Sequence, residues 1–154
     1  MYPTDVFVPV GGGGLCTAVA RGFDDLAAEQ LRAGGVVRIH GVQPVTNDTI
    51  VTPWRLGLDR ARPVAESTGI SGLAVPNDID GSRALRAVRA SGGTAVAVAE
   101  EEIYAVRRDL CLHEGLYVEP AGATSAAGLV RAAREGGYRA AGPVVCVLTG
   151  HGFK

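Results

Sequence analysis

The chain has 154 residues, with 15 basic and 16 acidic side chains, a net charge of -1 at pH 7, 47% hydrophobic residues and 22 glycines. This length suits a single domain, and the balanced charge argues against a nucleic-acid partner, because no basic excess is available to neutralise phosphates. The sequence shows neither a signal peptide nor an apolar run near the ~20 residues of a membrane span, and its three widely spaced cysteines fit reduced thiols. We therefore expect a cytoplasmic protein without a membrane partner.

The N-terminal stretch predicts a strand, a glycine loop and a helix in succession. Residues 6–10 form a nearly continuous apolar run, which is typical of a strand buried on both faces. Four glycines follow at once: Gly11, Gly12, Gly13 and Gly14. From Leu15 the apolar residues recur at helical spacing, which predicts a helix over residues 15–33 that ends at Gly34 and Gly35. Backbone N–H groups at such a helix start, with no Cβ in front of them, favour a phosphate ligand over the alternative of a plain flexible turn.

The following stretch gives weaker signals. A second strand is predicted over residues 36–42. Within it, His40 is interpreted as a hydrogen-bonded strand histidine rather than a catalyst, because the sequence shows no partner for a general base. Prolines interrupt residues 45–77, which we predict to be irregular apart from a helix near residues 56–66. No function is assigned to this segment.

The next part of the sequence predicts a helix, a strand and a second helix. Asp80 is the expected N-cap of a helix over residues 82–91, whose arginines recur every three residues. These arginines are Arg83, Arg86 and Arg89. We interpret them as a solvated face rather than an anion site. A strand is expected over residues 94–99, and three consecutive glutamates then begin a helix that ends at Gly115. The helix dipole explains these acids better than a metal site does.

The C-terminal part adds a helix and a last strand. Glu119 and Pro120 open a helix of mostly small residues over residues 121–134, and residues 143–148 form an apolar strand that we expect to be central. The order of elements predicts an α/β fold, a three-layer and mostly parallel sheet with helices on both faces. Because ligands bind beyond the carboxyl ends of such strands, one ligand is expected to contact both the glycine loop and Thr149.

Three segments together resemble a known enzyme family. They are VPVGGGGL at residues 8–15, EPAGATSAAGL at residues 119–129 and LTGHGFK at residues 148–154. In this order they resemble the C-terminal half of pyridoxal-phosphate enzymes of the tryptophan-synthase-β type (fold type II), with threonine synthase as the nearest branch. The resemblance implies that residues 1–154 form one domain, which corresponds to part of the large, cofactor-binding domain of that family.

The resemblance also implies a site for the cofactor, pyridoxal 5'-phosphate. The backbone of the glycine loop (residues 11–14) and Leu15 would hold the phosphate, and Thr149, in a turn with Gly150, would face the pyridine nitrogen. Glu119 would stand near the ring, or else serve only the start of its helix. A neutral hydroxyl makes the ring a weaker electron sink, which favours elimination and replacement over transamination. No metal is implied.

One departure limits the resemblance. The Schiff-base lysine of the family lies upstream of the glycine loop, whereas the only lysine of this chain is Lys154. We therefore expect no catalytic residue here, and a second polypeptide that supplies the lysine and the loop for the substrate carboxylate. The predicted function is a subunit of a split, threonine synthase-like lyase or β- or γ-replacement enzyme that acts on a small amino acid and can dimerise further. The alternatives are a non-catalytic module, which binds a phosphate ligand or a protein, and an expressed fragment.

Overall fold

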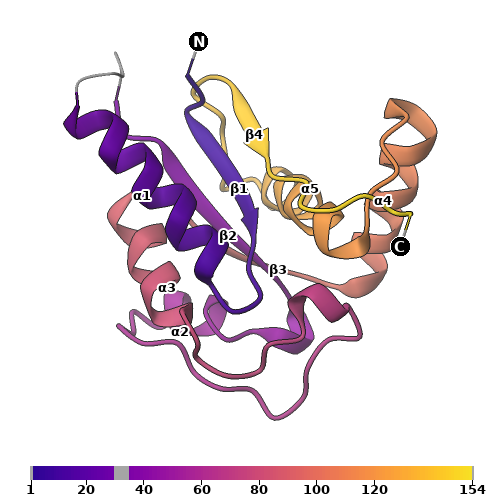
Figure 1. The fold of residues 1–154 in the computed structure, drawn as a ribbon, viewed down its shortest axis with the longest axis horizontal. Coiled ribbons are helices and arrows are strands. Elements are labelled where there is room, and N and C mark those ends of the chain that lie inside the picture. The colour runs from indigo at the N-terminus through magenta and orange to yellow at the C-terminus, as the bar shows by residue number, and fades with distance from the viewer. Residues whose placement is uncertain (1, 30–34, 154) are drawn as a thin grey trace.

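The computed structural model describes residues 2–29 and 35–153 (Figure 1). The strands are β1 (Asp5–Pro9), β2 (Arg38–Pro44), β3 (Ala95–Val98) and β4 (Val144–Cys146). The helices are α1 (Gly14–Ala28), α2 (Val51–Arg55), α3 (Gly81–Ala90), α4 (Glu100–Glu114) and α5 (Pro120–Arg134), with short 3-10 turns at η1 (Val45–Asn47) and η2 (Ser71–Leu73). None of the helices among these residues is long and apolar enough to cross a membrane.

The strands form one parallel sheet in the order β3-β2-β1-β4. Helices α1 and α3 pack together on one face, α5 covers the other face, and α4 lies outside α5 (Figure 1). The expectation of a three-layer α/β fold is therefore confirmed. Because all four strands run the same way, their carboxyl ends meet at one edge of the sheet, where the glycine loop begins.

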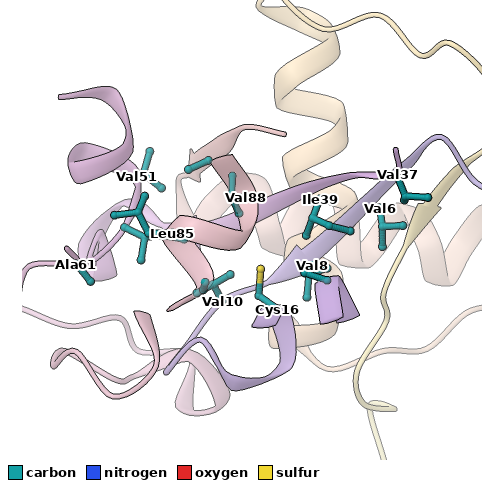
Figure 2. Packing of buried hydrophobic residues seen from close by; sticks show 14 residues of the cluster. Val6, Val8, Val10, Cys16, Val37, Ile39, Val51, Ala61, Leu85 and Val88 are labelled. Atoms are coloured by element: carbon teal, nitrogen blue, oxygen red, sulfur yellow. The ribbon is translucent and has the colours of Figure 1, made fainter. Parts of the chain in front are cut away.

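Strand β1 explains why the sequence reads as an unbroken apolar run. Its side chains alternate between the two faces, so Val6 and Val8 enter the core under α1 and α3, whereas Phe7 enters the core under α5. Figure 2 shows Val6 and Val8 close to Cys16 of α1, with Leu85 and Val88 of α3 in the same core. In a strand that is covered on both faces no position points to solvent, so apolar residues do not alternate with polar ones.

Helix α5 packs closely on the sheet because its residues are small. A Cβ added at Gly128 would lie 2.4 Å from Cγ2 of Val42, a distance at which something must move. Alanines of the same helix, including Ala123 and Ala127, are fully or almost fully buried. The expectation that this helix is built for close packing is confirmed.

Two helix boundaries differ from the sequence-based expectation. Helix α1 ends at Ala28, and the expected end at residues 33–34 lies outside the described residues. The helix expected near residues 56–66 is absent, and the short helix α2 stands before it instead. Gly57, with φ of 72°, follows the last turn of α2, and a left-handed residue of this kind ends a helix.

The expected central position of the last strand is wrong for the described part of the chain. Strand β4 pairs only with β1 and lies at the edge of the sheet. Its middle residue, Val145, is 43% exposed. The apolar run had indicated burial on both sides, but among the described residues the sheet supplies a neighbour on one side only.

Two polar expectations around α3 also need correction. Asp80 occupies the N-cap position without a side-chain cap, and the backbone N–H of Ser82 instead donates to Asp78 Oδ1 at 2.9 Å. Arg89 does not belong to a solvated face. Its side chain is partly buried, and its guanidinium donates to the carbonyl oxygens of Pro53, Trp54 and Leu58. Pro53 and Trp54 belong to the end of α2 and Leu58 follows it, so Arg89 adds donors to a helix terminus whose Pro53 and Trp54 carbonyls also accept the backbone N–H groups of Leu58 and Gly57.

His40 is a structural residue, as its sequence context indicated. Its side chain is 1% exposed and stacks on Phe7. The backbone N–H of Thr94 donates to Nδ1 at 3.1 Å, so Nε2 carries the proton and donates to Asp5 Oδ1 at 2.9 Å. Arg38 Nε lies 2.7 Å from the same carboxylate, which gives Asp5 a cationic partner. The network fastens β1 to β2 at the end of the sheet away from the glycine loop.

This network makes the free energy of unfolding depend on pH. Burial lowers the pKa of His40, so below about 6.5, the ordinary value, the unfolded chain binds a proton that folded His40 does not. For Asp5, burial raises the pKa, but hydrogen bonds from His40, Arg38 and Thr4 outweigh it and the net shift is downward. Both shifts act in one direction: stability is full above pH ~6.5, falls as His40 is forced to protonate, and falls again below pH ~4. Urea unfolding between pH 8 and 5 should show this loss.

Two histidine variants isolate the source of that pH dependence. His40→Gln should unfold at lower urea concentration at every pH but should lose most of the change between pH 7.5 and 5.5. His113→Gln, at an exposed position near the end of α4, should keep the wild-type change. An unchanged pH profile in His40→Gln would contradict the assignment.

Candidate cofactor site

The glycine loop takes the shape expected of an anion-binding turn. Gly13 precedes α1 with φ of 96°, and a Cβ there would lie 2.6 Å from the backbone carbonyl of Asp80, so only glycine fits. Thr17 donates to the Gly13 carbonyl through both its N–H, at 3.0 Å, and its hydroxyl, at 2.9 Å. The first N–H groups of α1 have no carbonyl partner within the helix and remain available to a ligand.

A cavity of about 280 Å³ lies in front of this loop. Its lining residues are Pro9, Gly11, Gly12, Gly13, Gly14, Leu15, Gly72, Leu73, Glu119, Ala121 and Thr149. Residues from both ends of the chain therefore share one cavity, at the carboxyl end of β1 and beside the segment that follows β4. The expectation that one ligand can contact both the glycine loop and Thr149 agrees with this geometry.

The segment around η2 forms a wall of the cavity that the sequence did not indicate. The carbonyl oxygen of Gly72 lies 3.0 Å from the position of a Cβ on Gly11, and the N–H of Asp80 donates to the Gly12 carbonyl at 2.7 Å. This segment lies in residues 45–77, to which no function was assigned. The small spacing of Gly69 and Gly72 is its only sequence signal, and glycine pairs are too common in this chain to single it out.

Helix α4 holds this wall in place through its first residue. The hydroxyl of Thr68 donates to Glu100 Oε1 at 2.5 Å, and the N–H of Gly69 donates to the same oxygen at 3.2 Å. The hydrogen bond from Thr68 is the main reason that the pKa of Glu100 lies below its usual value. Glu102 accepts from the N–H of Ala99 and pairs with Arg131 of α5. Of the three glutamates, these two thus have structural partners, which agrees with the capping interpretation.

Of Glu119 and Gly150, both predicted to belong to the site, only Glu119 lines the cavity. Glu119 lines the cavity at the N-cap position of α5, but its side chain makes no capping hydrogen bond. Its carboxylate lies against Gly150, where an added Cβ would clash with it. Gly150 stands behind Thr149 and is not a lining residue of the cavity. Glu119 thus lines the cavity with its carboxylate against the Thr149 turn, and its two expected roles, near the ring or only at the helix start, both stay predictions.

The residues around the cavity fit a phosphorylated pyridine. Four glycines and a helix N-terminus supply N–H donors for a phosphate, and Thr149, which also lines the cavity, supplies a hydroxyl. A larger cavity of about 340 Å³ elsewhere has polar lining residues that include Arg38, His40, Arg55 and Glu135. Arg38 and His40 already bind Asp5, and no helix begins at this cavity to supply free N–H groups. The glycine-loop cavity is thus the candidate site.

Comparison with known proteins agrees with this assignment. A family model described as pyridoxal-phosphate dependent enzyme matches residues 2–150. The chain is 34% identical over 153 residues to threonine synthase from Methanosarcina acetivorans, and 33% identical over 157 residues to threonine synthase from Methanocaldococcus jannaschii. Each alignment covers 99% of this chain but only 38% of the relative. The chain thus spans well under half the length of these curated relatives.

Solved structures show the same partial coverage. The processed form of threonine deaminase isoform 2 from Solanum lycopersicum matches with a TM-score of 0.74 and 23% identity, over 97% of this chain and 40% of that protein. Maize serine racemase matches with a TM-score of 0.74 and 20% identity, over 99% of this chain and 44% of that protein. At such identities the likeness establishes the fold, here part of a larger fold-type II domain. Together with the family model, it shows that the chain belongs to the family of pyridoxal-phosphate dependent enzymes.

Proposed function

We propose that the chain supplies the phosphate-binding and ring-binding side of a threonine synthase-like enzyme. The observation that carries this proposal is the meeting of the glycine loop and Thr149 in one cavity. The similarity to threonine synthases over 99% of the chain supports this branch of the family over others. The substrate class is a small amino acid, and the reaction is an elimination or a replacement at its β or γ carbon.

Each residue of the cavity has a defined role in this proposal. The N–H groups of the glycine loop and of Leu15 donate to the cofactor phosphate, and the dipole of α1 adds about 0.3–1 kcal/mol or more. The hydroxyl of Thr149 donates a hydrogen bond to the pyridine nitrogen but does not transfer its proton to it. When bound, the cofactor supplies the electron sink for bond cleavage at the amino acid. Glu119 keeps the Thr149 turn in place from the other side.

The lysine that carries the cofactor has to lie outside residues 1–153, because the sequence has a lysine only at position 154. Lys154 itself lies outside the described residues. We propose that a second, cytoplasmic polypeptide provides the lysine together with the loop that binds the substrate carboxylate. The two polypeptides would then form a split enzyme, with further dimerisation possible through surfaces of either one.

Borohydride trapping tests this division of roles. We expect that pyridoxal phosphate mixed with the chain alone and then reduced leaves no cofactor on residues 2–153, since an imine needs an amine and these residues carry none, and that no lyase or replacement activity appears. Addition of the lysine-bearing polypeptide should produce both a trapped cofactor on that polypeptide and activity. Binding of the cofactor phosphate without activity in the mixture would favour the non-catalytic module instead. A trapped cofactor within residues 2–153, with turnover, would overturn the proposal.

A further inference from the structure

Thr149 is not positioned by the sheet. The last hydrogen bond between this segment and the sheet runs from the N–H of Val147 to the carbonyl of Phe7, at 3.0 Å. Strand β4 has already ended at Cys146, and residues 147–150 belong to no strand or helix. The side chain proposed to face the pyridine nitrogen therefore stands on an irregular segment, which needs another source of rigidity.

Helix α5 and the residue before it provide that rigidity. The hydroxyl of Ser125, which is fully buried, donates to the carbonyl of Val147 at 2.9 Å, which is shorter than its contact with the Gly122 carbonyl of its own helix at 3.2 Å. The N–H of Glu119 donates to the carbonyl of Gly150 at 2.9 Å. These two bonds hold the chain immediately before and after Thr149. Farther along, the N–H of Gly152 donates to the carbonyl of Tyr117 at 2.8 Å, so the whole turn lies along α5 and the link before it.

Gly122 sets the separation between α5 and this turn. A Cβ added at Gly122 would lie 3.2 Å from the N atom of Thr149 and 3.3 Å from the carbonyl oxygen of Gly150. Contacts this short require the neighbour to shift by a few tenths of an ångström. The neighbour here is the backbone that carries the Thr149 side chain, so any shift moves the hydroxyl relative to the glycine loop.

We infer that Ser125 and Gly122 are positioning residues, which fix the Thr149 hydroxyl at the distance from the glycine loop that a ring nitrogen and a phosphate on the same ligand require. This inference rests on the proposed function, since it assigns a role towards the same ligand. Neither residue lines the cavity, so both act through Thr149. A shift of a few tenths of an ångström weakens the ring contact and leaves the phosphate contacts in place.

The test compares two ligands that differ only at the ring nitrogen. They are 4'-deoxypyridoxine 5'-phosphate and its 1-deaza analogue, neither of which has an aldehyde, so binding needs no lysine. Dissociation constants are measured by calorimetry on the cofactor-free assembly of this chain with its lysine-bearing polypeptide. If Thr149 donates to the nitrogen, the wild type should bind the first ligand about 5–10-fold more tightly than the second, as one hydrogen bond allows. Thr149→Val should bring this ratio close to 1.

Ser125→Ala and Gly122→Ala should each lower the ratio several-fold, while affinity for the deaza analogue changes little. Thr124→Val is the matched control, because the Thr124 hydroxyl is buried in the same helix and bonds only to the Pro120 carbonyl of that helix. It should keep the wild-type ratio, even if its thermal unfolding midpoint falls as far as that of Ser125→Ala.

The possible failures are distinguishable. No binding of either ligand to the wild type would overturn the proposed function and this inference with it. A ratio that Thr149→Val removes but that both Ser125→Ala and Gly122→Ala preserve would leave the function intact and overturn the positioning role. If Ser125→Ala does not fold, Gly122→Ala alone decides, because it adds one methyl group and removes no hydrogen bond.

Discussion

Replacement of Gly12 by aspartate is expected to abolish pyridoxal phosphate binding while the chain stays folded. Gly12 lines the cavity, and a Cβ there would meet only the side chains of Val75 and Ile79, at 3.6 Å, which is ordinary contact. Its φ is not positive, so an L-residue fits the backbone. A substitution without a clash or strain changes the free energy of unfolding by about 1 kcal/mol or less.

The expected loss of affinity comes from charge. A carboxylate about 5 Å from the phosphate costs about 3 kcal/mol per pair of unit charges at an effective dielectric constant of about 20. The phosphate carries nearly two charges, so even after solvent screening the affinity should fall by more than about 100-fold. Calorimetry with 4'-deoxypyridoxine 5'-phosphate measures this loss directly, without any contribution from the lysine.

Gly12→Asn is the matched control, because it has the same shape without the charge. It should lose far less affinity than Gly12→Asp, with Gly12→Ala closer still to the wild type. Gly13→Asp is not a clean test. The left-handed φ of Gly13 and its contact with the backbone of Asp80 mean that any side chain there strains the fold. Equal affinities of Gly12→Asp and Gly12→Asn would place the phosphate elsewhere.

Apart from α2, the order of elements was predictable because the elements leave local signals. The switch from an unbroken apolar run to helical spacing marks the change from β1 to α1, and the glycines between them mark the loop. Gly115 ends α4 in the left-handed conformation that its position after a run of helical residues indicated. Such signals lie within a few residues of the boundary they mark, so a single sequence is enough to find them.

The features that were missed depend on partners far away in the sequence. Arg89 looked like one of three equivalent surface arginines, but only the fold brings the end of α2 within reach of its guanidinium. The wall of the cavity around Gly72 has no periodicity, and its position depends on Glu100. The glycine loop and Thr149 were found from the sequence since parallel strands align their carboxyl ends. The role of Ser125 could not be found from the sequence, because its hydrogen bond to Val147 spans 22 positions.

The isolated chain is expected to self-associate as its concentration rises. Strand β4 presents an unpaired edge among the described residues, and the Val145 side chain at its centre is 43% exposed. A second apolar surface lies on the outer side of α4 and the link after it, where Tyr104, Leu112 and Leu116 are exposed. An open strand edge with an apolar side chain is a template for pairing with another chain. Sedimentation velocity over a range of concentrations should show species larger than the monomer.

Val145→Lys should reduce this association, because a lysine on an edge strand opposes pairing by its charge and its hydration. Val36→Lys is the control, since Val36 is 68% exposed but belongs to no strand, so the same gain of charge should leave association unchanged.

We expect the proposed lysine-bearing polypeptide to distinguish the same two variants by its binding. Obligate interfaces typically bury more than about 2,000 Å² in total. If the polypeptide covers β4 in such an interface, it should form a defined complex with the wild type and with Val36→Lys. It should bind Val145→Lys poorly, because burying an unpaired ammonium group costs free energy. If the wild-type chain remains a monomer at high concentration and unfolds cooperatively, the exposed edge of β4 is stable in water. That result would favour an autonomous module over a split enzyme.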